Sequence, residues 1–367
     1  MSQKIIHLIA AARPNFMKIA PLFHALNDLD WTDVRIIHTG QHYDYNMSGA
    51  FFDELGLPSP HYHLEVGSGS HAEQTGGVMI AYEKVCVDAR PDCVVVVGDV
   101  NSTVACAMVA TKLWIPCVHL EAGLRSGDRS MPEEINRLAT DAIADLLWTP
   151  SPDADENLAH EGTDPKRVER VGNIMIDSIE LLREQIEGTA LPESVGNDAP
   201  YALVTLHRPS NVDEKEPLQR LVNELNQVAK KIRLVFVAHP RTMARLKSFD
   251  LLDTLSSSGD QIVLLEPAPY ITFMRLVMGS AMIITDSGGL QEESTYLGIP
   301  CLTLRPNTER PITITEGTNS LVTPETLLAE VDGVLDGSRK KPTSPPDLWD
   351  GKTAYRAAES LKRFLGA

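Results

Sequence analysis

Short apolar runs alternate along the first half of the chain with longer stretches in which apolar residues recur every three or four positions. The apolar runs predict strands at 4–10, 34–39, 93–97, 115–120 and 146–150, and the periodic stretches predict helices at 17–28, 72–88 and 102–113. Apolar strands that alternate with helices are typical of a parallel sheet covered on both faces. This half is therefore predicted to be an α/β domain.

The same pattern restarts after an aperiodic segment, 187–200, that is rich in Gly, Pro, Ser and acidic residues. Strands are predicted at 201–206, 234–239, 262–267, 282–287 and 300–305, and helices at 216–231, 270–280 and 289–297. We therefore expect two α/β domains, at 1–172 and 173–352, with a possible linking helix at 177–186. A last helix, within 353–367, is expected to pack back on the first domain.

Composition narrows the classes of partner. The 367 residues suit about two domains. The formal net charge is −17, which disfavours binding to nucleic acid or to an anionic membrane, because both require a basic surface. The five cysteines form no CxxC pair, so we expect buried free thiols, which suit a reducing cytoplasm. We find no signal peptide and no apolar stretch of about 18 residues that would span a membrane.

Polar and glycine-rich segments follow most of the predicted strands. Ligands of open parallel sheets bind at the carboxyl ends of the strands, so these segments predict a binding site. The segment DSGGLQEE (286–293) joins a strand end to a Gly-Gly turn and a helix start, which suits a phosphate, although Ser287 could simply cap the helix. Cations also follow strands, and they suit either a diphosphate or surface ion pairs: Arg13, Lys18, Arg305 and Arg310.

Several ionisable residues occupy similar positions. Asp99 follows four valines and Glu121 follows an apolar run, where a carboxyl group is suited to acid–base chemistry. Glu133 and Glu134 come after Pro132, where catalysis and helix capping remain equally open. His207 could bind phosphate, transfer protons or lie in the core. We find no metal-ligand spacing, P-loop or GxGxxG motif, so no metal or nicotinamide cofactor is expected.

Taken together, these segments resemble the non-hydrolysing UDP-N-acetylglucosamine 2-epimerases over residues 4 to 365. The matching segments are ARPNFMKIAPL (12–22), TGQH (39–42), GDVNST (98–103), HLEAGLRS (119–126), MPEEINR (131–137), VGN (171–173), TLHRPSN (205–211), HPRT (239–242), DSGGLQEE (286–293) and RPNTERP (305–311). The resemblance implies a GT-B-type architecture of two Rossmann-like domains flanking a deep cleft. It also implies a homodimer that needs no metal or nicotinamide cofactor; the cytoplasmic location is expected from the cysteines.

The resemblance further implies a reaction and a set of site residues. UDP is eliminated anti from UDP-N-acetylglucosamine to give 2-acetamidoglucal, and its syn re-addition gives UDP-N-acetylmannosamine. Catalysis is then assigned to Asp99, Glu121, Glu133 and His207. Glu293 is placed on the ribose and Phe273 near the uracil. The other implied substrate-binding residues are Arg13, Lys18, Gln41, His42, Arg125, Asn173, Arg208, His239, Ser287, Gly288, Gly289 and Arg310.

The sequence also departs from the family pattern. Many bacterial members carry an Arg-Glu pair, near a regulatory substrate molecule, where this chain has Tyr43-Asp44 and Pro209-Ser210. We therefore expect no requirement for substrate as an activator. The segments HRPSN and RPNTERP also occur in relatives that act on UDP-2,3-diacetamido-2,3-dideoxyglucuronic acid, so that substrate is an alternative. A GT-B glycosyltransferase, a hydrolysing epimerase and a non-catalytic sugar-nucleotide sensor are the remaining alternatives.

Overall fold

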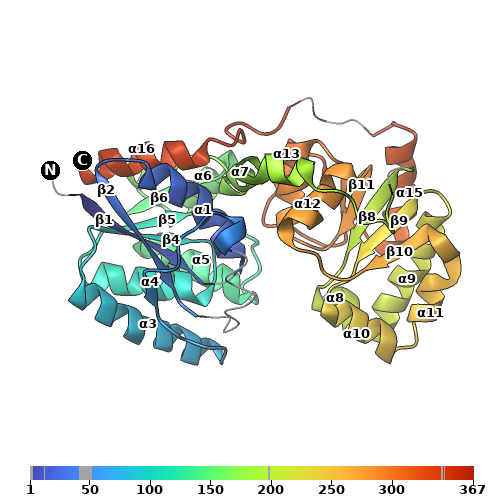
Figure 1. The fold of residues 1–367 in the computed structure, drawn as a ribbon, viewed down its shortest axis with the longest axis horizontal. Helices are drawn as coiled ribbons and strands as arrows, with labels where there is room; N and C mark the ends of the chain where they lie inside the picture. Colours follow the sequence, from blue (N-terminus) through green and yellow to red (C-terminus); the bar gives the residue numbers. More distant parts are fainter. Residues whose placement is uncertain (1–2, 12, 41–51, 197–198, 340–341, 343) are drawn as a thin grey trace. The chain divides into compact units, whose positions relative to one another are not determined.

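The computed structural model describes residues 3–11, 13–40, 52–196, 199–339, 342 and 344–367 (Figure 1). The chain forms two compact units. The first comprises Met1–Leu181 together with Asp347–Ala367, and the second comprises Leu182–Pro346. Each unit is an α/β structure built on a parallel sheet, as the hydrophobic pattern predicts.

The sheet of the first unit has seven parallel strands in the order β3-β2-β1-β4-β5-β6-β7. Their bounds are β1 Lys4–Ala10, β2 Thr32–His38, β3 Tyr62–His63, β4 Cys93–Val97, β5 Cys117–Leu120, β6 Leu146–Thr149 and β7 Val168–Arg170. Strands β1, β4, β5 and β6 are almost completely buried because both faces are covered by helices. The strand order reverses between β1 and β4, and ligands of such sheets bind beside a reversal.

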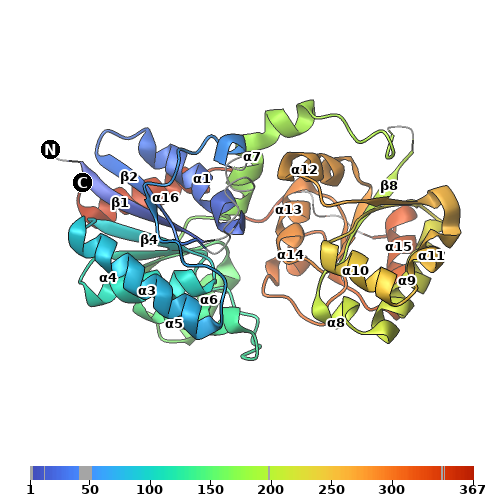
Figure 2. The ribbon, with the colours of Figure 1, turned by 60° about the horizontal axis from the view of Figure 1, so that its bottom comes forward.

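Helices cover both faces of this sheet. They are α1 Arg13–Asn27, α3 His71–Asp88, α4 Asn101–Lys112, α5 Pro132–Ile143, α6 Pro152–His160, α7 Ile174–Gly188 and α16 Thr353–Leu365, with the short 3-10 helix η1 Pro165–Arg167. Helices α1 and α16 lie together on one face, and α3, α4 and α5 lie on the other (Figures 1 and 2). Local sequence sets several helix starts: Ser70 and Glu73 form a capping box for α3, and Pro132 and Pro152 open α5 and α6.

The second unit has six parallel strands in the order β10-β9-β8-β11-β12-β13. The strands are β8 Tyr201–Thr205, β9 Arg233–Val237, β10 Ile262–Leu265, β11 Met282–Thr285, β12 Cys301–Thr303 and β13 Asn319–Leu321. The helices are α8 Pro209–Val212, α9 Lys215–Ala229, α10 Pro240–Ser248, α11 Leu252–Leu255, α12 Tyr270–Gly279, α13 Gly289–Leu297, α14 Ile312–Thr315 and α15 Pro324–Leu335, with the 3-10 helix η2 Ser256–Gln261. Helices α12 and α13 cover one face, and α9 and α15 cover the other (Figure 2).

Helix α16 lies against the first unit although the second unit precedes it in the chain. It packs on α1, and the Trp148 indole donates a hydrogen bond to Ser360 at 2.9 Å. The Asp177 carboxylate accepts the Ala354 N–H at 2.7 Å, which satisfies a free donor at the start of α16. The end of the chain therefore completes the first unit.

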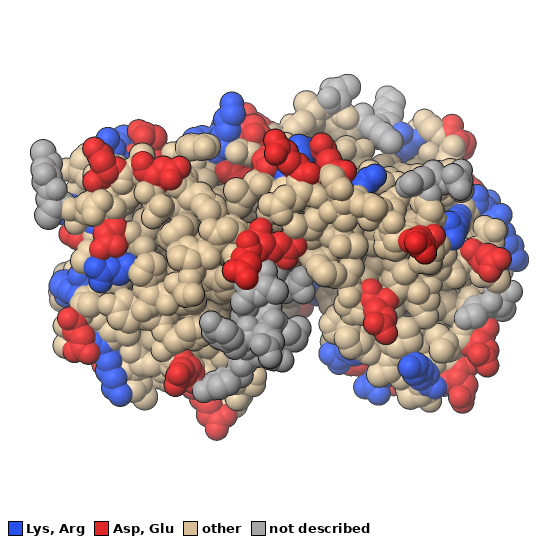
Figure 3. All heavy atoms as spheres, in the orientation of Figure 1, with Lys and Arg blue, Asp and Glu red and all other residues tan. Residues whose placement is uncertain are grey.

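Burial and charge agree with the composition. All five cysteines are free and buried, as expected. On the face drawn in Figure 3, lysines and arginines are interspersed with aspartates and glutamates. No helix among the described residues is long and apolar enough to cross a membrane.

Candidate active site

The carboxyl end of the first sheet holds a buried ion pair between Lys18 and Glu121. Lys18 comes from α1 and its ammonium group contacts Glu121 Oε2. Glu121 follows β5 with a φ of 70°, a left-handed conformation that is uncommon for a residue with a side chain. Its other oxygen, Oε1, is buried and has no hydrogen-bond partner among the described residues. The carboxylate is therefore held through one oxygen, and its second, buried oxygen makes no hydrogen bond to the described residues.

The backbone of Gly98 lies directly beside this ion pair. It follows β4 with a φ of 68°, and a Cβ atom there would lie 3.2 Å from Lys18 Nζ and 3.3 Å from Glu121 Oε2. The Asn15 amide donates to the Val97 carbonyl at 3.1 Å and holds α1 against the end of β4. A glycine at position 98 thus lets the backbone approach the two charged groups closely.

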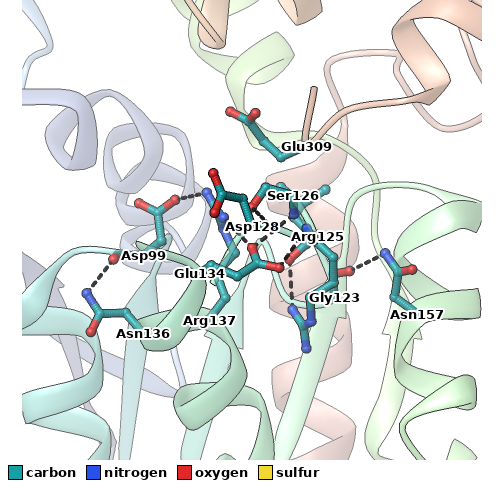
Figure 4. A network of polar contacts seen from close by, with 12 residues as sticks. Asp99, Gly123, Arg125, Ser126, Asp128, Glu134, Asn136, Arg137, Asn157 and Glu309 are labelled. Carbon is teal, nitrogen blue, oxygen red and sulfur yellow. Dashed lines mark hydrogen bonds and ion pairs between the residues drawn. The ribbon is translucent and has the colours of Figure 1, made fainter. Parts of the chain in front are cut away.

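Asp99 and helix α5 are joined by a polar network (Figure 4). The Asp99 carboxylate pairs with the Arg137 guanidinium, which also contacts Glu134 at 3.0 Å. Glu134 accepts the backbone N–H groups of Ser126 and Gly127 at 2.9 and 3.0 Å. The loop that follows β5 is thereby fastened to the first turn of α5.

The two glutamates of that turn have different surroundings. Glu134 is buried, which opposes its ionisation, but the Ser126 and Gly127 N–H groups and Arg137 hold its pKa below the usual value. Glu133, by contrast, is exposed. The contacts of Glu134 give it a structural role. The assignment of Glu133 to catalysis stays a prediction.

A second buried network contains His119 and Asp141. His119 Nδ1 lies 2.6 Å from Asp141 Oδ1, and its Nε2 lies 2.8 Å from the Gly98 carbonyl oxygen. The second Asp141 oxygen accepts the Gly123 N–H at 3.0 Å and contacts Arg125 at 2.8 Å. Arg125 also makes two hydrogen bonds of 2.8 Å to Glu161. Arg125, predicted to bind substrate, is thus engaged within the first unit.

In the second unit, Asp286 organises the end of β11. It is completely buried and accepts the backbone N–H groups of His207 and Arg208 at 3.0 and 2.9 Å. The Asn211 amide and His207 Nδ1 each approach it at 3.0 Å. Burial alone would raise the pKa of Asp286, but hydrogen bonds from His207 and Asn211 hold it below the ordinary value. Asp286 is therefore an anionic anchor that orients the His207 imidazole.

The predicted His207, Arg208 and His239 come together at this edge of the second sheet. The His207 side chain is 42% exposed, so its ring remains open to a ligand while Asp286 holds it. The His207 and His239 ring centroids are 5.8 Å apart. Burial, and then the neighbouring His207, lower the pKa of His239. His239 Nδ1 accepts the Arg241 N–H and caps α10.

The start of α13 rests on a row of alternating charges. Glu309 contacts Arg305 at 2.9 Å and Arg310 at 2.6 Å, and Arg310 also lies 2.7 Å from Glu292. Burial opposes the ionisation of Glu309, but Arg310 and Arg305 hold its pKa well below the usual range. A Cβ atom on Gly288 would lie 2.8 Å from Glu309 Oε1, whereas one on Gly289 would meet nothing within 4 Å. These charges hold the Arg310 guanidinium beside the start of α13, where helix N–H groups favour an anion.

The carboxyl group of Glu293, on the same helix, is buried. Burial raises its pKa to about 7, although the Tyr270 hydroxyl, 3.2 Å away, opposes the shift. Tyr270 and the predicted Phe273 lie three residues apart on α12, and Phe273 is half-buried. Ser287 does not cap α13 with its side chain; its N–H donates to Thr285 Oγ1 at 3.0 Å.

The remaining predicted residues fall into two groups. Gln41 and His42 lie outside the described residues, as do Tyr43 and Asp44, and so does the side chain of Arg13. Asn173 is fully buried, and its side-chain oxygen accepts the Met175 N–H at 3.0 Å. Among the described residues, no group of three His, Cys, Asp or Glu side chains is placed to hold a metal ion.

Some site residues were not predicted. Arg137, Asp141 and His119 support the first site, and Asp286 anchors His207. One signal was present in the sequence: Glu134, Arg137 and Asp141 lie at i, i+3 and i+7, so they share one face of α5. A row of charged residues on a buried helix face indicates partners elsewhere in the site.

Two doubly wound parallel sheets, each with polar groups gathered at its carboxyl edge, define an enzyme of the GT-B-like class. A structure described as the glycotransferase of kitacinnamycin shares this fold, with a TM-score of 0.58 at 14% identity over 98% of this chain and 99% of that one. That likeness concerns the fold alone.

The comparisons with more similar proteins identify the family. The sequence model of the UDP-N-acetylglucosamine 2-epimerase family matches residues 24–362 of this chain. A UDP-N-acetylglucosamine 2-epimerase of Methanocaldococcus jannaschii is 44% identical over 97% of this chain and 98% of its own length. The crystal structure of the M. jannaschii enzyme with UDP-GlcNAc and UDP covers 98% of this chain and 99% of that one, with a TM-score of 0.86 at 41% identity. A UDP-2,3-diacetamido-2,3-dideoxy-D-glucuronate 2-epimerase of Pseudomonas aeruginosa is 37% identical over 87% of this chain and 88% of its own length.

The chain belongs to the UDP-N-acetylglucosamine 2-epimerase family and is an isomerase. The resemblance inferred from the sequence motifs is thereby confirmed, and so is the α/β fold of GT-B type.

Proposed function

We propose that this enzyme interconverts UDP-N-acetylglucosamine and UDP-N-acetylmannosamine by inverting carbon 2 of the sugar. The observation that carries the proposal is Glu121, a buried carboxylate in a chain of this family. One of its oxygens is held by Lys18, and the other has no partner among the described residues. A positioned carboxylate of this kind is suited to moving the proton of carbon 2.

The reaction proceeds in two steps. A carboxylate removes the proton from carbon 2, the carbon 1–oxygen bond breaks, and UDP leaves with that electron pair, so that 2-acetamidoglucal remains. The diphosphate oxygen then adds back to carbon 1, and a proton is delivered to the opposite face of carbon 2. Glu121, Asp99 and Glu133 are the proposed carboxylates, of which Asp99 is paired with Arg137.

Departure of UDP requires stabilisation of a diphosphate, for which the second unit supplies the groups. His207 is held toward solvent by Asp286, and the N–H groups at the start of α13 and the Arg310 guanidinium are donors for the phosphate oxygens. Glu293 is proposed to accept hydrogen bonds from the ribose hydroxyls, and Phe273 to lie beside the uracil. The further proposed contacts are Arg13, Lys18, Gln41, His42, Arg125, Asn173, Arg208, His239, Ser287, Gly288 and Gly289.

The substrate itself has one alternative. The P. aeruginosa relative, named for UDP-2,3-diacetamido-2,3-dideoxy-D-glucuronate, is 37% identical to this chain. A sugar with a second acetamido group at carbon 3 and a carboxylate at carbon 6 is therefore the second candidate. We further propose that the enzyme is a cytoplasmic homodimer; its five buried free thiols are compatible with a reducing compartment.

Proton NMR in deuterated water tests the reaction directly. The purified enzyme is incubated with UDP-N-acetylglucosamine without added metal or cofactor. We expect the manno epimer to form and both epimers to carry deuterium at carbon 2. Absence of exchange with this substrate, but exchange with the 2,3-diacetamido uronic acid, would assign the alternative.

Variants then test the assigned roles. Glu121→Gln and His207→Ala should each lower kcat by at least about 100-fold while the thermal transition is retained. Arg310→Ala should weaken UDP binding in calorimetry. A near-normal rate, or an unchanged affinity for UDP, would remove the residue concerned from the proposal.

A further inference from the structure

His119 is a completely buried residue of β5 with hydrogen bonds at both ring nitrogens. Nδ1 lies 2.6 Å from Asp141 Oδ1, and Nε2 lies 2.8 Å from the Gly98 carbonyl oxygen. A carbonyl oxygen can only accept a hydrogen bond, so Nε2 must carry a proton. The state of Nδ1 then depends on whether Asp141 is ionised.

Asp141 is ionised in this environment. Its second oxygen accepts the Gly123 N–H and contacts the Arg125 guanidinium. The Arg125 cation and the Gly123 N–H stabilise the carboxylate form of Asp141 whatever the charge of the His119 ring. An ionised carboxylate also only accepts hydrogen bonds, so Nδ1 carries a proton as well. Both ring nitrogens are therefore donors.

We propose that His119 is a buried imidazolium and a positioning residue, which fixes the Gly98–Asp99 turn beneath the Lys18–Glu121 pair. The positioning role rests on the proposed function, whereas the charge of the ring does not. Charges alternate along the network Glu161, Arg125, Asp141 and His119, so the cation is compensated within the first unit. The other ionisable groups near its contact with Gly98 are Lys18 and Glu121.

Gly98 is the point at which this network reaches the candidate active site. The N–H of Gly98 donates to the Leu120 carbonyl, and its carbonyl accepts from His119, so both peptide groups are fixed. The site where its Cβ would stand is 3.2 Å from Lys18 Nζ and 3.3 Å from Glu121 Oε2. A shift of this turn would therefore move the Gly98 backbone away from the Lys18–Glu121 ion pair and would also move the backbone of Asp99.

Two matched variants separate the two hydrogen bonds of the ring. In His119→Asn the amide nitrogen takes the place of Nδ1 and can donate to Asp141, but it does not reach the Gly98 carbonyl. In His119→Gln the amide nitrogen takes the place of Nε2 and can donate to Gly98, whereas Asp141 loses its hydrogen bond from residue 119 and keeps its contact with Arg125.

We expect kcat of His119→Asn to fall about 10- to 100-fold relative to wild type, because the catalytic groups are misaligned. KM for UDP-N-acetylglucosamine should stay within about twofold of wild type, because the contacts that bind the substrate remain. His119→Gln should be at least about fivefold faster than His119→Asn. It should melt at a lower temperature, because it leaves a buried oxygen of the Asp141 carboxylate without a hydrogen-bond donor. Wild-type kcat in His119→Asn, or equal losses in the two variants, would overturn the positioning role.

The charge is tested separately by NMR of wild-type enzyme labelled with nitrogen-15 in histidine. The spectrum of His119→Asn identifies the His119 signals among those of the 11 histidines. We expect both His119 nitrogens to be protonated at pH 7, because each faces a hydrogen-bond acceptor. One protonated and one bare nitrogen at pH 7 would overturn the imidazolium. If wild-type enzyme fails to epimerise either candidate sugar, the proposed function fails, while this spectrum still decides the charge.

Discussion

Glu293 is a buried carboxyl group whose proposed role in binding the ribose and whose contribution to stability should depend on pH in opposite directions. Its buried carboxyl group has a pKa of about 7 instead of 4.5, so the fold favours the protonated form. The stability that this shift contributes is fully present below about pH 4.5 and is lost as the pH rises through about 7. This contribution is on the order of 3 kcal/mol. We expect the melting temperature of the unliganded enzyme to fall from pH 5 to pH 8, and this component of the fall to be absent in Glu293→Gln.

The affinity for UDP should change in the opposite direction. Only the ionised Glu293 accepts hydrogen bonds at both oxygens, so calorimetry should show tighter UDP binding at pH 8 than at pH 6. Tyr270→Phe is the matched control, since it removes a hydroxyl that lowers this pKa and should shift the midpoint to higher pH. If Glu293→Gln retained wild-type affinity for UDP at pH 8, Glu293 would have no role in binding the ribose.

The neighbouring Glu133 and Glu134 allow catalysis and structure to be separated. Glu133→Gln changes an exposed side chain, so we expect the melting temperature to stay constant and kcat to fall by at least about tenfold. Glu134→Gln weakens a buried network with Arg137 and two N–H groups and should cost about 1–3 kcal/mol. Urea unfolding and steady-state kinetics measure both quantities. A fully active Glu133→Gln enzyme would exclude Glu133 as an acid or base.

At the scale of elements, the turn into α13 contains two glycines with different surroundings. An alanine side chain at position 288 would meet Glu309 Oε1 at 2.8 Å and disturb the charges around Arg310, so Gly288→Ala should lower both stability and UDP affinity. At position 289 nothing lies within 4 Å, and alanine suits a helix start better than glycine. We therefore expect Gly289→Ala to keep or raise the melting temperature. If a phosphate occupies that space, the variant should still lose UDP affinity in calorimetry; unchanged affinity would place the phosphate elsewhere.

Elements with a strong local signal were predicted to the residue. Strands β1 and β4 are apolar runs that end at polar or glycine residues, and helix α13 begins after a Gly-Gly turn; all three have the predicted bounds. The edge strands β3, β7 and β13 were missed. Each has only two or three residues and incomplete burial, because a single neighbouring strand defines it. Such strands depend on pairing between distant segments, which periodicity does not report.

The same distinction holds for the site. Lys18, Asp99 and Glu121 could be singled out because they follow strands of the sheet, and the fold brings them together around Gly98. The partners Arg137, Asp141 and His119 were not singled out. The spacing of Arg137 and Asp141 indicates a charged face of α5, but it does not name their partners, which lie 20 to 40 residues away in the chain, as the 38 between Arg137 and Asp99 illustrate. The left-handed backbone of Glu121 likewise has no signature in residue type.

At the scale of the whole molecule, the chain passes from one unit to the other twice, after Leu181 and after Pro346. The two segments of the first unit that flank these crossings contact each other. Gly172 has a φ of 99°, and a Cβ atom there would lie 2.4 Å from the Leu348 carbonyl oxygen. The Arg356 guanidinium donates to the carbonyl groups of Val171 and Leu348 at 2.6 and 2.7 Å. The segment before α7 and the segment before α16 thus form one connection, to which Asp177 adds its bond to Ala354.

Because of this topology, we expect the two units to differ in their ability to fold when they are separated. The second unit, 182–346, is continuous in sequence, whereas the first requires α16 from the far end of the chain. We expect a chain of residues 182–346 to unfold cooperatively and to bind UDP through the contacts proposed for the second unit. Its affinity should be lower than that of the full chain if Lys18, a proposed contact that belongs to the first unit, binds UDP. A chain of residues 1–346 should keep the transition of the second unit and lose that of the first, because the faces of α1 and Trp148 that α16 covers become exposed. Calorimetry with and without UDP separates the two transitions, since the ligand should raise only that of the second unit. A first unit that melts normally without α16, or an isolated second unit without affinity for UDP, would contradict this division of the molecule.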